Sequence, residues 1–177
     1  MCADIRELLK SISGGDTGAL GELYELMSAR VLNYARMISQ NHELSEDVMH
    51  DVFLSIYAQA GRIADAPNPE GYIMVMTRNR TYNLLKYRRR EETSLDDMRE
   101  TSGGEMADGY LMFEDALESL PANQRETIYL RLICGYTYKE TAKIQNAPLV
   151  TVKWRYGKAI DKLRDYFGEE ESQNERV

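Results

Sequence analysis

Cysteine and histidine are scarce in this chain. Its 177 residues include two cysteines, Cys2 and Cys134, and two histidines, His42 and His50. The cysteines are too few and too far apart in sequence for a disulfide scaffold or a zinc site, and the histidines add no cluster with the spacing of metal ligands. We therefore expect no metal, no cofactor, and a Cys134 that is reduced and buried.

Long apolar runs are also missing. No stretch approaches the roughly 20 apolar residues of a membrane-spanning helix, and the N-terminal segment MCADIRELLKSISGG has acidic residues and no long apolar core. We expect no secretory signal, no membrane insertion and a location in the cytoplasm. An enzyme is not expected either, because the chain lacks a phosphate-binding glycine loop and any motif that pairs a nucleophile with a base.

Acidic residues outnumber basic ones, but the two kinds are unevenly distributed. The net charge of -7 argues against a free-standing nucleic-acid binder, because affinity for a polyanion comes mostly from Lys and Arg. The cations gather in two stretches, 78–90 and 137–166, whereas acids gather at 91–115 and in the C-terminal tail. This pattern predicts a protein that touches DNA twice and depends on a partner for most of its affinity.

The apolar spacing is helical throughout the first ninety or so residues, and we find no strand-like alternation of useful length. Asp16 or Thr17 begins one helix, Asn41-His42-Glu43 interrupts it, and Ser45 is expected to cap the next. A third helix is expected over 71–90, after a loop marked by two prolines.

The segment 100–110 is Gly-rich and acidic, which is typical of a flexible linker. After it we expect a short helix over 112–119 and another that ends at Gly135, with Ile128, Leu132 and Ile133 on its apolar face. The prediction is an all-α protein of two small helical domains, at 1–90 and 112–168, joined by an acidic flexible linker at 91–111 and followed by an acidic tail at 169–177.

The stretch from Thr137 to Arg164 has the pattern of a helix-turn-helix, whose second helix enters the DNA major groove. Thr137 and Glu140 form a capping box, the turn follows at 145–147, and Pro148 suits the first position of a helix. An inner stripe is expected at Val152, Tyr156, Ala159 and Leu163. It leaves on outward or flanking positions Thr151, Lys153, Trp154, Arg155, Lys158 and Lys162. The other interpretation is an ordinary packed helix with a solvated basic face.

With both halves considered, the chain resembles the extracytoplasmic-function (ECF) sigma factors, the two-domain group of the sigma-70 family of bacterial RNA polymerase. GDTGALGELYELM, LSEDVMHDVFLSIY and MTRNRTYNLLKYRRR resemble the family's region 2, which would occupy 1–90. LPANQRETIYLRLICGYTYKETAKI and PLVTVKWRYGKAIDKL resemble region 4, a helix-turn-helix that would occupy 112–168. The fragments occur in the family's order and spacing.

The resemblance implies roles for residues in region 2. Docking on the β′ clamp helices of core RNA polymerase would involve Asp47, Val48, His50, Asp51 and Phe53. Recognition of the promoter minus-10 element would involve Arg78, Asn79, Arg80, Asn83 and Lys86, since amides pair with base edges and guanidinium groups hold phosphates. The preceding loop, Gly61 to Glu70, would form a pocket for a flipped base, with Tyr72 as a stacking surface.

In region 4, the resemblance implies that Lys153, Trp154, Gly157 and Lys158 read minus-35 bases, while Thr151 and Arg155 contact phosphates. Expected partners are core polymerase, through its β′ clamp helices and β flap, promoter DNA, and an anti-sigma factor, which the family often has. The chain departs from the family pattern at His50, Tyr72, Met74, Val75, Thr141, Gln145, Asn146, Leu149 and Val150.

Three alternatives stay open from the sequence. Val48 and Phe53 fit the core of their own domain as well as a docking surface, and Trp154 fits a core or an interdomain contact, because a lone Trp is most often buried. The whole chain also fits a stand-alone helix-turn-helix regulator. The second basic stretch and the docking motif before it favour the sigma factor.

Overall fold

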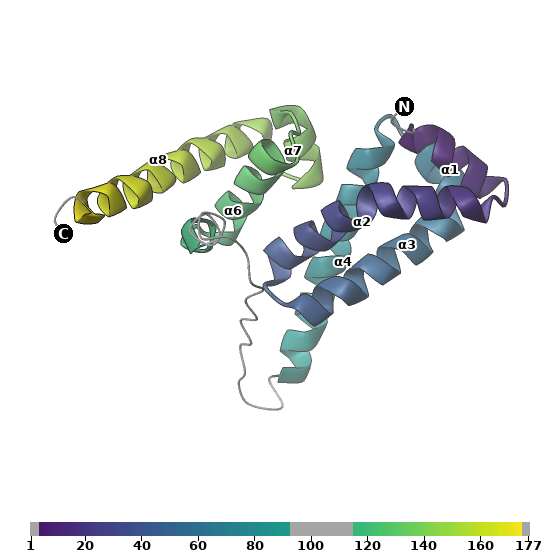
Figure 1. Ribbon diagram of the computed structural model, residues 1–177, viewed down its shortest axis with the longest axis horizontal. Coiled ribbons are helices and arrows are strands. Elements are labelled where there is room, and N and C mark those ends of the chain that lie inside the picture. Colours follow the sequence, from purple (N-terminus) through teal and green to yellow (C-terminus); the bar gives the residue numbers. More distant parts are fainter. Residues whose placement is uncertain (1–3, 93–114, 175–177) are drawn as a thin grey trace. The chain divides into compact units, whose positions relative to one another are not determined.

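A computed structural model describes residues 4–92 and 115–174. The chain divides into two compact units, Met1–Ser102 and Gly103–Val177, which Figure 1 shows in purple to teal and in green to yellow. All regular elements among the described residues are helices, so the all-α prediction is confirmed. The linker predicted at 91–111 falls almost entirely outside the described residues, and so do Gly103 and Gly104.

Four helices form the first unit: α1 (Ile5–Ser13), α2 (Thr17–Ser39), α3 (His42–Ala64) and α4 (Pro69–Glu92). Helices α2, α3 and α4 pack against one another, and α1 packs on α2 and α3. The core that they enclose includes fully buried Leu9, Leu23, Met27, Tyr34, Leu44, Val48, Ile56, Ile63, Ile73 and Met74. This packing determines which face of each helix is exposed to solvent.

The predicted cap of α3 was wrong by four residues. Asn41 is the N-cap, and its side-chain oxygen accepts a hydrogen bond from the N–H of Leu44 at 2.8 Å. The chain reverses direction just before, at Gln40, which has a left-handed φ of 53°. Ser45 is instead buried inside the first turn, where its hydroxyl donates to the carbonyl of Asn41. The earlier start lets Leu44, 1% exposed, join the core.

Helix α4 divides its faces by type. Ile73, Met74, Thr77 and Thr81 are buried, and each threonine hydroxyl donates to the carbonyl four residues earlier, at 2.9 Å for Thr77 and 2.8 Å for Thr81. These bonds satisfy the hydroxyls without a partner from another helix. The buried face therefore holds α4 in the bundle and turns its polar positions outward.

The second unit begins with a helical turn at 115–118 and continues with α6 (Ala122–Ile128), the π-helix η1 (Tyr129–Ile133), α7 (Tyr138–Ile144) and α8 (Leu149–Asn174). Its core cluster joins the start of the unit to α8 through Ala116, Leu117, Leu120, Ile128, Ala159 and Leu163. Helix α8 is longer than expected, since it continues through six residues of the predicted acidic tail.

The π-helix changes the predicted apolar stripe. In η1 the N–H of Cys134 bonds to the carbonyl of Tyr129, five residues earlier, at 3.0 Å. The wider turn shifts the register of the following side chains relative to the core. Leu132 and Ile133 are thereby 51% and 48% exposed, although the sequence pattern predicted both on the buried face. Cys134 is half-buried, whereas the sequence predicted a buried residue.

The helix-turn-helix forms as predicted at its two local signals. Thr137 and Glu140 make the capping box, in which the N–H and the hydroxyl of Thr137 each donate to Glu140 Oε2 at 2.8 Å. These bonds, the backbone one first, lower the pKa of Glu140 from its ordinary value. Asn146 has a left-handed φ of 48° in the turn, which Asn tolerates. Helix α8 begins at Leu149, so Pro148 immediately precedes the first helical position instead of occupying it as predicted.

Candidate nucleic-acid interface

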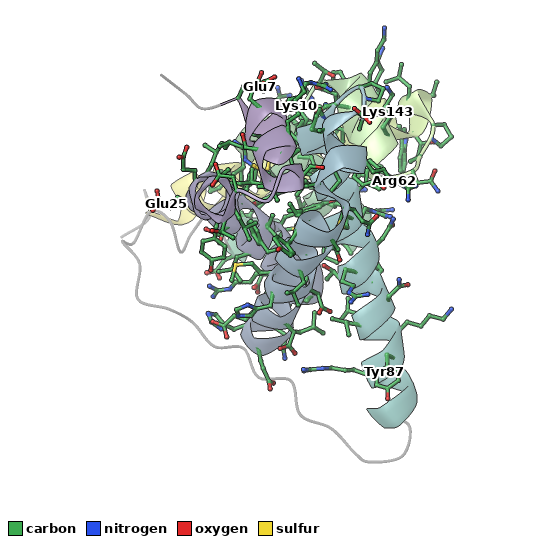
Figure 2. All side chains as sticks on the ribbon, turned by 90° about the vertical axis from the view of Figure 1, so that its right-hand side faces the viewer. Glu7, Lys10, Glu25, Arg62, Tyr87 and Lys143 are labelled. Carbon is green, nitrogen blue, oxygen red and sulfur yellow. The ribbon has the colours of Figure 1, made fainter. Side chains whose placement is uncertain are left out.

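The outward face of α4 carries the amide and basic side chains singled out from the sequence. Asn79, Arg80, Asn83 and Lys86 are exposed and Arg78 is half-buried. The guanidinium of Arg78 lies 4.6 Å from the ring centre of Tyr82, which is itself on the surface. Farther along the helix Tyr87 is exposed as well (Figure 2). The face thus combines base-pairing amides, cations and aromatic rings.

Ion pairs connect this face to α3. Arg80 Nε lies 2.9 Å from Asp51 Oδ2, and Arg88 lies 3.5 Å from Asp47 and 3.6 Å from Glu43. The structure therefore brings residues of two predicted sites together, since Asp47 and Asp51 were assigned to polymerase and Arg80 to DNA. Nothing in the local sequence signals these contacts, because each joins residues about 29 to 45 positions apart, by their numbers in the chain.

The residues predicted to dock on polymerase divide into two groups. Asp47 and His50 are exposed and Asp51 is half-buried, so these three form a polar edge on α3. Val48 and Phe53 are only 0% and 7% exposed, and the Phe53 ring lies 4.8 Å from that of Tyr24 on α2. For Val48 and Phe53 the core interpretation describes the structure.

Leu54 belongs to the same exposed edge and was missed in the sequence. It is 68% exposed, and it follows His50 by four positions and Asp51 by three, which is the spacing of one helix face. That spacing was the available signal. An exposed leucine flanked by carboxylates and an imidazole gives the edge an apolar contact point.

The segment before α4 is shorter than predicted and is held from outside. Helix α3 continues to Ala64, so only 65–68 are non-helical, and the expected ten-residue loop from Gly61 to Glu70 does not form. Arg6 of α1 donates to the carbonyls of Ala64, Ala66 and Pro67, the second at 2.9 Å and the third at 3.3 Å. Sequence reasoning missed Arg6, because its partners lie 58 to 61 positions away.

The α4 end of the same segment is fixed by two further contacts. Asn68 accepts a hydrogen bond from the N–H of Gly71 at 2.9 Å, and Arg30 of α2 pairs with Glu70 in the first turn of α4. Tyr72, the expected stacking surface, is half-buried. The short segment therefore has a defined shape between two arginines from other helices.

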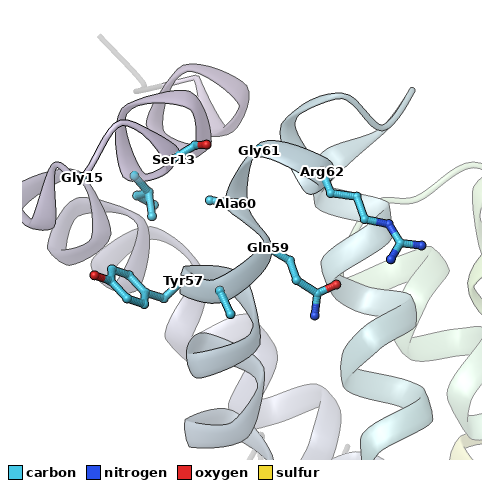
Figure 3. A pocket seen from close by; sticks show the side chains of 9 residues that line it. Ser13, Gly15, Tyr57, Gln59, Ala60, Gly61 and Arg62 are labelled. Atoms are coloured by element: carbon cyan, nitrogen blue, oxygen red, sulfur yellow. The ribbon is translucent and has the colours of Figure 1, made fainter.

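A depression of about 760 Å³ opens between the end of α1 and the last turns of α3 (Figure 3). Helix α3 is kinked there at Gln59, with φ −128° and ψ 20°, and Ser13 of α1 faces Gly61. A Cβ at Gly61 would lie 2.8 Å from the Ser13 hydroxyl oxygen, so glycine permits this close approach. Of the residues assigned to a site from the sequence, only Gly61 and Arg62, the first two of the predicted loop, line the depression.

In the second unit, α8 presents the predicted recognition residues on its surface. Lys153, Gly157 and Lys158 are exposed, and Thr151 and Arg155 are half-buried. Trp154 is 58% exposed, so it is not a core residue of its unit. A Cβ at Gly157 would meet no atom within 4 Å, which leaves open space beside Lys158 and Trp154. Of the predicted inner stripe, Val152, Ala159 and Leu163 are buried, and Tyr156 is half-buried against the same core.

Contacts around Tyr138 set the position of α8 against the rest of the unit. The Tyr138 and Tyr156 rings meet edge to face at 5.5 Å between centres, and the Arg131 guanidinium lies 4.2 Å from the centre of the Tyr138 ring. Lys153 Nζ lies 6.0 Å from the same ring. These contacts join η1, α7 and α8 at the end of α8 that carries the exposed cations.

Residues 4–92 and 115–174 contain no group of three or more His, Cys, Asp or Glu side chains placed to hold a metal ion. In the same part of the chain, none of the helices has both the length and the apolar content that crossing a bilayer requires.

Two family models match the chain, each within one of its units. Sigma-70 region 2 matches residues 23–91 and Sigma-70, region 4 matches residues 116–165. The chain belongs to the sigma-70 family. Both regions occur in the order that the sequence analysis expected, which does not favour a stand-alone regulator.

Similar proteins place it among the ECF sigma factors of that family. The ECF RNA polymerase sigma factor SigK of Mycobacterium sp. (strain JLS) is 25% identical over 93% of this chain and 91% of the relative. ECF RNA polymerase sigma factor EcfG of Rhodopseudomonas palustris (strain TIE-1) is 27% identical over 73% of this chain and 75% of the relative. The protein is thus an RNA polymerase sigma factor.

Solved structures agree with the fold. The sigma factor RpoE of Bartonella quintana, crystallised in complex with the anti-sigma factor NepR, has a TM-score of 0.72 at 25% identity and covers 82% of this chain and 94% of its own. CnrH, in complex with the cytosolic domain of CnrY, has a TM-score of 0.65 at 21% identity and covers 94% of this chain and 99% of its own. At that identity the second likeness concerns the fold alone.

Proposed function

We propose that this sigma factor docks on core polymerase through the exposed edge of α3 and contacts promoter DNA through α4 and α8. The observation that carries the proposal is a shared design of the two DNA-facing helices. Each helix buries one face in the core of its own unit and exposes amide or basic side chains on its opposite face. Such a helix can reach bases and phosphates without disturbing its core.

For the minus-10 element, the proposed contacts are those of Asn79 and Asn83 with base edges and of Arg78, Arg80 and Lys86 with phosphates. Amide side chains offer both a donor and an acceptor, which suits an unpaired base edge. Met74 is not available for strand separation, since it is fully buried. The half-buried Tyr72 and the short segment 65–68 are proposed to receive the flipped base.

For the minus-35 element, the proposed base contacts are those of Lys153, Trp154, Gly157 and Lys158, with Thr151 and Arg155 on phosphates. Lys forms hydrogen bonds with guanine in the major groove, and an exposed aromatic ring contacts the thymine methyl group. Gly157 lets the helix approach the bases closely, because a side chain there would occupy the space toward the DNA.

The proposed role requires no catalytic group in the chain itself, and it places the protein with RNA polymerase in the cytoplasm. We also propose an anti-sigma partner. Its support is the Bartonella quintana relative, which is described in complex with one. We propose that the two functional domains span 1–90 and 112–168. The acidic segment 91–111 is proposed to link them.

Run-off transcription with core polymerase tests the proposal. The template is a promoter selected by the reconstituted holoenzyme from a pool randomised at both elements, and Asn79→Ala and Lys158→Ala are compared with the unchanged chain. Each loses a base-specific contact worth about 1–3 kcal/mol, so discrimination at the contacted element falls about tenfold. Glu25→Gln, an exposed change on α2 outside the proposed contacts, is the control. Equal weakening on selected and scrambled elements would show that both residues contact phosphates only.

A further inference from the structure

A buried polar network lies beneath the helix-turn-helix turn. Gln145, at the end of α7, is 3% exposed, and Thr127 of α6 is completely buried. The Thr127 hydroxyl donates to the carbonyl of Asn123 at 2.8 Å, and Gln145 Nε2 donates to the same hydroxyl at 3.1 Å. At its other end Gln145 Oε1 accepts a hydrogen bond from Arg155 Nη1 at 3.2 Å.

Because the Gln145 amide is buried, its contacts with Thr127 and Arg155 matter for stability. A buried amide is unfavourable unless its donor and its acceptor each find a partner. On the nitrogen side, Nε2 reaches the Thr127 hydroxyl and, at 3.5 Å, the carbonyl of Asn123. On the oxygen side, Oε1 lies 3.2 Å from both the Thr127 hydroxyl and Arg155 Nη1. The single hydroxyl proton of Thr127 has a shorter bond to the Asn123 carbonyl, at 2.8 Å, so Arg155 of α8 is the donor left for Oε1. The network therefore connects α6 and α7 to a single side chain on the DNA-facing helix.

Arg155 retains most of its hydrogen-bonding capacity in this arrangement. A guanidinium has five N–H donors in a planar fork, and the contact with Gln145 uses one of them. Arg155 is half-buried and lies on the same helix as exposed Trp154 and Lys158. A side chain already fixed in direction loses less freedom when it binds a phosphate or a base than one that samples many rotamers.

We propose that Gln145 is a positioning residue for promoter recognition, because its side-chain oxygen orients Arg155 on the surface of α8. This inference rests on the proposed function, in which Arg155 contacts minus-35 DNA. It adds a dependence that the contact residues alone do not imply: recognition by α8 requires a buried amide that never touches the DNA.

A double-mutant cycle on the holoenzyme tests the coupling. The quantity measured is the ratio of holoenzyme affinities for a promoter that carries the minus-35 duplex selected by the unchanged holoenzyme and for the same promoter truncated before that element, so that phosphate and base contacts of α8 both contribute. Gln145→Leu is expected to lower this ratio about 2- to 10-fold when Arg155 is present, from the cost of ordering one long side chain. In an Arg155→Ala background the same change is expected to alter the ratio less than about twofold.

Two further variants separate orientation from folding. Gln145→Glu keeps an oxygen for Arg155, so it is expected to retain the ratio even if the chain loses stability through the lost donor to Thr127. Lys143→Ala changes an exposed residue of α7 outside the network and is the matched control. Thermal unfolding of every variant shows whether the fold is intact, and Gln145→Glu decides the matter if Gln145→Leu does not fold.

Equal losses for Gln145→Leu in both backgrounds, or no loss in either, would overturn the inference. A loss in Gln145→Glu as large as in Gln145→Leu would overturn it as well. If Arg155→Ala leaves the ratio unchanged while Lys158→Ala lowers it, the positioning role fails but the proposed function stands. If neither substitution lowers the ratio, the proposed minus-35 site itself is wrong.

Discussion

Helices α4 and α8 present similar chemistry to solvent but hold it in different electrostatic surroundings. On α4, Arg80 and Arg88 are paired with carboxylates of α3. On α8, Lys153 and Lys158 form no ion pair within the described residues, and Lys153 lies near the Tyr138 ring instead. In the absence of DNA, the two arginines on the proposed face of α4 are therefore paired with carboxylates, whereas the two lysines on the proposed face of α8 are not paired within the described residues.

The chain has a net charge of -7, so we expect its DNA binding to depend on polymerase. The difference between α4 and α8 indicates that this dependence is not the same for the two units. The carboxylates that pair with α4 lie on the edge proposed to dock on polymerase, so a partner that engages Asp47 and Asp51 competes with Arg80 and Arg88 for them. Within the described residues, no carboxylate pairs with Lys153 or Lys158 of α8, so we expect no such competition there. We expect DNA binding by the first unit to depend more strongly on polymerase than binding by the second.

The largest expected effect concerns how α4 is held in its bundle. Met74→Lys introduces a charge at a fully buried position and is expected to destabilise the first unit by about 3–5 kcal/mol. Val75→Lys, next in sequence but only partly buried, is expected to cost about 1 kcal/mol or less. Urea unfolding followed by circular dichroism measures both. Equal losses would contradict the assignment of faces on α4.

The second effect concerns Arg6. Arg6→Ala removes charge-assisted hydrogen bonds to carbonyls of 64–67 and is expected to lower the unfolding free energy by about 2 kcal/mol. It is also expected to impair promoter opening, because it frees the segment before α4. Lys10→Ala is the control, since Lys10 is exposed on α1 and, among the residues that the structure describes, pairs only with Glu7. Permanganate reactivity of promoter thymines measures opening. Unchanged reactivity in Arg6→Ala would show that Arg6 has no role in promoter opening.

A smaller effect is expected at the ion pair that links the two faces of the first unit. Asp51→Asn removes the partner of Arg80, a surface pair worth about 0.2–1 kcal/mol. The free protein is then expected to bind single-stranded minus-10 DNA up to about fivefold more tightly, with the gain vanishing at high salt. Glu25→Gln on α2 removes the same charge from the same unit, and Glu25 is exposed and forms no ion pair within the described residues. If the two variants gain equally, the effect is one of net charge alone.

The smallest effect concerns the capping box of α7. The pKa of Glu140 is lowered from 4.5 by hydrogen bonds from Thr137. Its contribution to stability is therefore complete above about pH 4.5 and is lost as the pH falls through the lowered value. The difference in melting temperature between the unchanged chain and Glu140→Gln is expected to shrink as the pH falls below 4.5. A difference that is independent of pH would contradict the role of the carboxylate.

The sequence predicted best what depends on neighbours along the chain. Capping residues three positions apart, such as Thr137 and Glu140, and the stripe of Val152, Ala159 and Leu163 follow directly from helix geometry. The tolerance of Asn146 for a left-handed turn is likewise local. These signals located the helix-turn-helix and the exposed side of α8.

Competition between local signals and long-range contacts explains what was missed. Asn41 and Ser45 are both good caps, and burial of Leu44 decides between them. A rule based on α-helical spacing cannot predict the π-helix, which exposes Leu132 and Ile133. Contacts such as Arg6 with the carbonyls before α4, or Arg80 with Asp51, require knowledge of which helices pack together.

The most direct test of the account is the affinity of the full-length chain for two DNA fragments, with and without core polymerase, at physiological salt. The fragments are a single-stranded minus-10 oligonucleotide and a minus-35 duplex, both taken from the selected promoter, and fluorescence anisotropy measures binding. We expect weak binding of both by the free protein, and a gain on adding core polymerase that is larger for the minus-10 strand. Tight, sequence-specific minus-10 binding by the free protein, or an equal gain for the two fragments, would contradict it.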